Sequence, residues 1–80
     1  MTKTLYRPEN EILLRLLRER RKAAGLTQAQ CSEALGRPQS YMSDVEKGSR
    51  RLDIIQLRDL CHVLGTSLPA FVTELEASLQ

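Results

Sequence analysis

The sequence predicts an all-α fold, a compact domain of five short helices. No segment alternates strictly between apolar and polar residues with β-branched side chains, as a half-buried strand would. Apolar residues recur instead at intervals of three and four, which is the spacing of one helix face. With 80 residues and only 4% aromatic residues, the chain must fill its small core mainly with aliphatic side chains. The expected helices are separated by Gly25, Gly36, Gly48 and Gly65.

The first helix is expected from Glu9 to Ala24, and residues 1–8 are expected to form an arm ahead of a single domain at 9–80. Acidic residues suit the N-terminal end of a helix dipole, and basic residues suit its C-terminal end. Glu9 and Glu11 stand at the first end. The basic residues at the other end are Arg20, Arg21 and Lys22. The inward stripe comprises Ile12, Leu13, Leu16 and Leu17.

Two shorter helices are expected in the middle of the chain, from Gln28 to Leu35 and from Pro38 to Lys47. Thr27 is a good N-cap for the first of them, and Gly36 lies in the turn between them. Two short helices joined by a tight turn of this kind form a helix-turn-helix. The side chains expected to face the core from these helices are Cys31, Ser32, Leu35, Pro38, Tyr41, Met42 and Val45.

The last two helices are expected from Ile54 to Leu64 and from Leu68 to Leu79, capped by Asp53 and Ser67. The side chains expected to face inward are Ile54, Leu57, Leu60, Cys61, Leu64, Leu68, Phe71, Val72, Leu75 and Leu79. The stripe on the last helix extends past what a small core needs. We therefore expect a contact between two copies of the chain at Phe71, Leu75 and Leu79, with packing on the chain's own first helix as the alternative.

The expected helix at 38–47 is unusually polar outside its narrow apolar side. A helix held by so few core contacts can be offered to the major groove of B-DNA, where its first turns do the reading. Gln pairs with adenine, Ser donates or accepts, and Asp accepts from the cytosine amino group. The expected base-reading residues are Gln39, Ser40, Ser43 and Asp44.

Basic residues flank this helix, and the chain is electrically polarised. From residue 15 to residue 51 nine Arg or Lys residues face four acids, whereas from residue 52 onward one Arg faces four acids. A basic patch attracts polyanions, although such charges can also serve only to keep a surface solvated. The expected phosphate contacts are Arg37, Lys47, Arg50 and Arg51, together with the hydroxyl of Tyr41 unless that ring serves only the core.

An enzyme is not expected, because the catalytic inventory is missing. His62 is the only histidine, and the chain has no Gly-rich phosphate loop. Cys31 and Cys61 stand apart and are expected to be buried, reduced thiols, so neither a metal site nor a cofactor is predicted. There is no long apolar run and no apolar signal-peptide centre, so the expected location is the cytoplasm, away from membranes.

Several spaced motifs resemble the lambda-repressor-like helix-turn-helix family, the phage-repressor, Cro and Xre type. They are GLTQ (25–28), ALG (34–36), SYMSDVEKG (40–48) and LCHVLG (60–65). The resemblance covers residues 13–75 and implies a five-helix domain that binds specific DNA sequences, usually as a homodimer on a palindrome.

The resemblance also implies roles for single residues. Gln28 would contact a phosphate or a base at the start of the second helix, and Arg21 would pair with Glu46 to brace the first helix against the third. Four positions depart from the family pattern. Cys31 replaces Leu and Ser32 replaces Ala, which makes the core smaller and more polar, and Arg20 replaces an apolar residue, which suggests an exposed edge. Asp44 stands where the family often has Lys, Gln or Asn, so it would either read a cytosine or lower the affinity for wrong sites.

These observations predict a transcriptional regulator of double-stranded DNA, specifically a repressor that acts as a homodimer. We expect no room for a ligand-sensing domain, so the protein's own concentration, a protein partner or cooperative binding would regulate it. The rival interpretation is a protein-interaction module, such as an antitoxin or adaptor, that uses the same fold and the acidic C-terminal segment.

Overall fold

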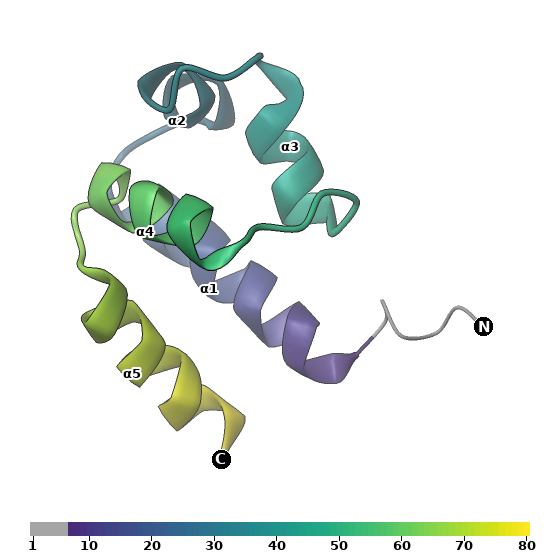
Figure 1. Cartoon of the computed structure of the whole chain (residues 1–80), viewed down its shortest axis with the longest axis vertical. Coiled ribbons are helices and arrows are strands. Elements are labelled where there is room, and N and C mark those ends of the chain that lie inside the picture. Colours follow the sequence, from purple (N-terminus) through teal and green to yellow (C-terminus); the bar gives the residue numbers. More distant parts are fainter. Residues whose placement is uncertain (1–6) are drawn as a thin grey trace.

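The computed structural model describes residues 7–80 and contains five α-helices and no strand within that range (Figure 1). The helices are α1 (Pro8–Ala23), α2 (Gln28–Ala34), α3 (Ser40–Lys47), α4 (Ile54–Val63) and α5 (Leu68–Leu79). The predicted all-α fold is confirmed. Residues 1–6 of the expected arm lie outside the described residues, and Pro8 already belongs to α1.

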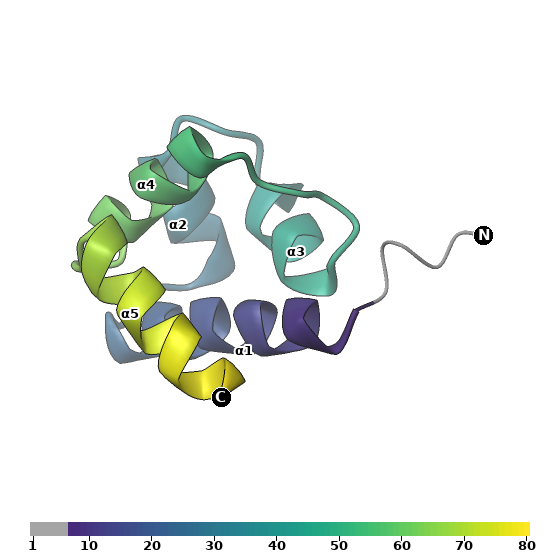
Figure 2. The same ribbon diagram turned by 60° about the horizontal axis from the view of Figure 1, so that its bottom comes forward.

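Helix α1 holds the domain together, because it contacts both α3 and α5. In Figure 2, α1 runs along one side of the molecule with α2, α3 and α4 on the other, and α5 crosses it. The remaining major contacts join α2 to α3 and α4 to α5. The helix-turn-helix therefore lies at one end of the molecule and α5 at the other (Figure 1).

The core lies where these helices meet. Leu17 of α1, Met42 of α3, Leu60 of α4 and Phe71 of α5 have no exposed area. Full burial of one such side chain contributes about 1.5–3 kcal/mol. The other buried hydrophobic residues are Leu16, Cys31, Tyr41, Val45, Cys61 and Leu64.

Both cysteines are free and completely buried, as expected. Burial raises the pKa of each thiol above its ordinary value of 9.0, because the thiolate would be desolvated. Cys31 and Cys61 therefore stay protonated and serve as small core residues.

The helix ends follow the expected signals. The side-chain oxygens of Thr27 and Asp53 accept hydrogen bonds from the backbone N–H groups of Gln30 and Gln56, at 3.0 and 2.7 Å. The side-chain oxygen of each glutamine in turn accepts a hydrogen bond from the backbone N–H of the capping residue, which completes two capping boxes. At the other ends, all four glycines adopt positive φ, the left-handed conformation that ends a helix.

The predicted inward stripes are wrong at three positions. Ile54 and Val72 are 58% and 42% exposed, because no other part of the described chain covers those sides of α4 and α5. Pro38 is exposed in the turn before α3, which begins two residues later, at Ser40. A helical wheel identifies an apolar stripe but does not say which of its edges a neighbouring helix covers.

Candidate nucleic-acid interface

The helix-turn-helix is fixed by a buried serine between its two helices. Ser32 is fully buried on α2, and its hydroxyl accepts a hydrogen bond from the backbone N–H of Met42 at 3.0 Å. The same hydroxyl donates to the carbonyl of Gln39 at 3.3 Å. By accepting from Met42, the hydroxyl satisfies one of the N–H groups that the first turn of α3 leaves without a partner inside the helix. The sequence interpretation, which treated Ser32 only as a small and polar core residue, missed this role.

A buried ion pair fixes α3 against α1. Arg21 on α1 donates from Nε to Oε2 of Glu46 on α3 at 2.6 Å, and from Nη2 to Oε1 at 3.2 Å. Its Nη1 donates to the carbonyl of Leu26 at 2.8 Å. Both charged residues are at least nine-tenths buried, and the hydrogen bond to Glu46 raises the pKa of Arg21. The structure contains the ion pair that the family resemblance implied.

Gln28 belongs to this same network. Its side-chain nitrogen donates to Oε1 of Glu46 at 2.9 Å, and the residue is half-buried. The start of α2 is thereby joined to the Arg21–Glu46 pair. The sequence predicts a contact from Gln28 to a phosphate or a base. In the structure its side-chain nitrogen already donates to Glu46, so a DNA contact would have to be made beside that bond.

The other expected base-reading residues gather on one side of α3. Gln39 and Ser40 are exposed at its start, and Ser43 and Asp44 are half-buried one turn further on. Residues three and four apart lie on the same helix face, so these four side chains form one polar strip. The carboxylate of Asp44 lies 3.9 Å from the ammonium of Lys47, which partly offsets its charge.

Two arginines from opposite ends of α3 meet on one aromatic ring. The guanidinium carbon of Arg37 lies 5.2 Å from the centroid of the Tyr41 ring, and that of Arg50 lies 4.9 Å from it. Tyr41 is only 5% exposed, whereas both arginines are exposed. Cation–π attraction holds the two charges close to the polar strip. The sequence predicts either a core or a phosphate role for Tyr41, but it does not indicate that the ring holds both arginines, an arrangement we call the arginine platform.

Helix α5 packs against α1 within the same chain. Phe71 is completely buried in the core, so it has no area to give to a second copy, and the structure removes it from the expected dimer contact. Leu75 and Leu79 are half-buried, and Leu75 packs against the core. Arg20, expected at an exposed edge, is half-buried and joins α1 to Glu74 of α5 through a 2.9 Å ion pair.

The structure also bears on the other kinds of site. No helix in the described part of the chain is long and apolar enough to cross a membrane. Among residues 7–80, no group of three or more His, Cys, Asp and Glu side chains is placed to hold a metal ion.

A polar strip on a short helix, set in place by helix-turn-helix packing and flanked by arginines, defines a DNA-binding domain of the helix-turn-helix class. The family model of the helix-turn-helix domain matches residues 12–75, so the chain belongs to that family. A solved structure, an XRE-family like protein from Pseudomonas syringae pv. tomato str. DC3000, is 44% identical. The match covers 99% of this chain and 96% of that one, with a TM-score of 0.86. The comparison with curated proteins found no match. The chain is thus an XRE-type member of a family of DNA-binding regulators.

Proposed function

We propose that the protein is a transcriptional repressor that binds a specific palindromic sequence in duplex DNA as a homodimer. The observation that carries the proposal is the polar strip on α3, a helix whose Tyr41 ring holds the guanidinium groups of Arg37 and Arg50. The guanidinium groups of Arg37 and Arg50 bind backbone phosphates and fix the position of the helix. Lys47 and Arg51 are also exposed and add positive charge around the end of α3.

Sequence is read by the side chains of the strip. Gln39 offers the paired donor and acceptor that match adenine, and Asp44 accepts from the cytosine amino group. Asp44 also repels phosphate, so it lowers the affinity for sites that lack a partner for it. Gln28, already bonded to Glu46, contributes by positioning α2 and has its amide oxygen left for a contact.

Dimerisation lets two copies of α3 enter successive major grooves, about 34 Å apart on one side of the duplex. Bound there, the dimer covers a promoter and excludes other proteins from it. The surface for the second copy includes the half-buried Leu75 and Leu79 at the end of α5. Sedimentation with and without the selected duplex measures the number of chains bound.

The test of the reading helix is selection of a random duplex library by the purified protein at near-physiological salt, followed by sequencing. We expect a palindrome with half-sites about one helical turn apart. Gln39→Ala and Ser40→Ala should each lower discrimination at one base position by about 1–3 kcal/mol. Gln80→Ala, which removes an exposed glutamine from the end of α5, is the matched control. If preference is unchanged in both α3 variants, this helix is not the reading element.

A second function, as a protein-interaction module such as an antitoxin or adaptor, is favoured by a different surface. Ile54 and Ile55 expose more than half of their area at the start of α4, and Val72 is exposed on α5. Salt separates the two functions, because DNA binding through several phosphates weakens steeply as salt rises, whereas an apolar interface does not.

A further inference from the structure

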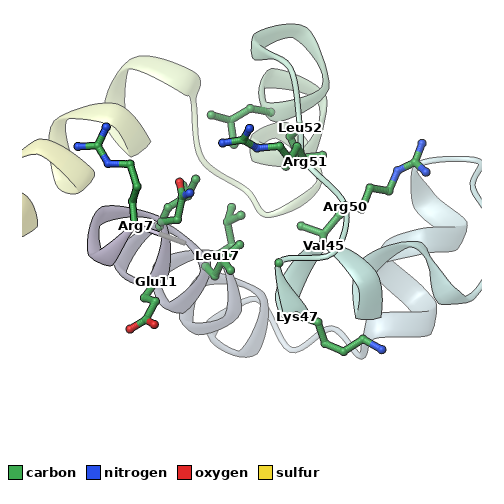
Figure 3. Close-up of a pocket in the computed structure, with 13 residues that line it drawn as sticks. Arg7, Glu11, Leu17, Val45, Lys47, Arg50, Arg51 and Leu52 are labelled. Atoms are coloured by element: carbon green, nitrogen blue, oxygen red, sulfur yellow. The ribbon is translucent and has the colours of Figure 1, made fainter. Parts of the chain in front are cut away.

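A pocket of about 310 Å³ lies beside the proposed DNA-binding surface (Figure 3). It is bounded by the first half of α1, the end of α3, the loop that follows α3, and Leu57 of α4. This volume is at the lower end of the range for small-molecule sites. The apolar side chains that line it are Leu13, Leu14, Leu17, Val45, Leu52 and Leu57.

The charged groups around this pocket are mainly positive. Arg7, Lys47, Arg50 and Arg51 line it against a single acid, Glu11. In Figure 3, Arg51 extends from its loop toward α1, whereas Lys47, Arg50 and the Glu11 carboxylate point away from the opening. Among residues 7–80, no ion pair or hydrogen bond occupies the Arg51 side chain.

The apolar side chains of this pocket, which we call its apolar floor, lie beside the guanidinium of Arg51, and this combination fits one kind of ligand. We propose that this pocket binds a small anionic amphiphile, an alkyl carboxylate, with its chain on the leucines and its head group at Arg51. A DNA phosphate would gain nothing from contact with the apolar floor, because a phosphate has no apolar part. A neutral ligand would accept only a weaker hydrogen bond from Arg51, and a cationic ligand would be repelled by the positive surroundings.

Arg7 supplies the second positive charge at this site. Its Nε lies 3.2 Å from the carboxylate of Glu9, which does not line the pocket. Both side chains of that pair are at least half exposed, and exposed pairs contribute at most about 1 kcal/mol. Arg7 therefore remains available to a bound anion.

The pocket is tested by titrating the full chain, without DNA, with the straight-chain series from butanoate to dodecanoate in a calorimeter, below micelle-forming concentrations. Affinity should rise about fourfold with each added methylene and then level off once the pocket is full. Octanol and octylammonium should bind at least about tenfold more weakly than octanoate, because the hydroxyl accepts only a neutral hydrogen bond from the guanidinium and the ammonium accepts none. An affinity that rises without levelling, or no binding at all, would overturn the proposal.

Three variants locate the ligand. Arg51→Gln should weaken octanoate binding about tenfold, whereas Arg58→Gln, which removes an exposed arginine of α4 outside the pocket, should not change it. Leu14→Phe narrows the floor and should move the levelling point to a shorter chain. Equal octanoate affinity in the wild type and Arg51→Gln would show that the carboxylate binds elsewhere.

A consequence for DNA rests on the proposed function. A carboxylate at Arg51 competes with a phosphate for the same N–H donors and repels it, so octanoate should weaken DNA binding, and DNA should weaken octanoate binding by the same factor. If octanoate binds as expected and DNA affinity does not change, the phosphate contact of Arg51 is wrong. If no DNA sequence is selected at all, the proposed function fails, and the titration without DNA still decides the pocket.

Discussion

Arg21 and Glu46 carry opposite charges inside the domain, and each compensates the other. Removal of one partner leaves an isolated charge away from water, so Arg21→Met should lower the free energy of unfolding by about 3–5 kcal/mol. Arg15 also pairs with an acid, Glu19, but both of those side chains are more than half exposed. Arg15→Met should therefore change stability by less than about 1 kcal/mol. Urea unfolding of both variants measures the difference, and equal losses would contradict the role given to burial.

Tyr41 offers a test of the arginine platform at the same scale. Tyr41→Phe keeps the aromatic ring and should leave DNA affinity within about twofold of the wild type. Tyr41→Leu removes both cation–π contacts, each worth about 0.5–1 kcal/mol, and should weaken DNA binding about 5- to 30-fold for each chain bound. Fluorescence anisotropy with the selected duplex gives the affinities, and circular dichroism checks that Tyr41→Leu is folded. A similar loss in both variants would assign the effect to the hydroxyl rather than the ring.

Among the helix ends, those of α2 and α3 depend on glycines in different surroundings. Gly36 and Gly48 both have positive φ, at 68° and 86°, where an alanine costs roughly 1–2 kcal/mol. A Cβ on Gly36 would meet open space, whereas one on Gly48 would lie 3.2 Å from a methyl group of Leu14. Gly48→Ala should therefore destabilise the domain more than Gly36→Ala in thermal unfolding. The excess should disappear when Leu14 is also alanine, and its persistence would place the strain elsewhere.

Most helix boundaries could be predicted from the sequence because their causes are local. Thr27, Asp53 and Ser67 each cap the helix that follows, and the left-handed glycines end the helices before them. Which apolar side chains are covered, by contrast, depends on tertiary structure. The covering of Phe71 and the exposure of Ile54 depend on which helices meet, and helical spacing does not contain that information.

The candidate site also combines features that could be predicted from the sequence with features that could not. The polar strip on α3 could be predicted because spacing along a single helix places its residues on one face. The bond from Gln28 to Glu46 and the stacking of Arg37 and Arg50 on one ring could not. Each joins side chains from separate elements, so each depends on how the helix-turn-helix packs.

Across the whole molecule, charge is separated along the chain, and the fold keeps this separation. Arg37 and Arg50 lie on the Tyr41 ring beside α3, while Glu74 on α5 pairs with Arg20 at the other end of the domain. A formal net charge of only +2 therefore hides a basic surface at one end. In the proposed function, such a surface would steer the domain toward DNA in one orientation, with α3 leading.

This electrostatic account predicts how salt acts on the assembled complex. Each phosphate contact releases counterions, so the logarithm of affinity should fall with the logarithm of salt concentration by about 0.9 per contact. Arg50→Gln should reduce the steepness of that slope by about 1 for each chain bound, and therefore by about 2 for a homodimer. Arg58→Gln should leave the slope unchanged. Both arginines are exposed, so neither change should unfold the domain. An unchanged slope in Arg50→Gln would mean that this guanidinium serves Tyr41 alone and that the phosphates are held by other residues.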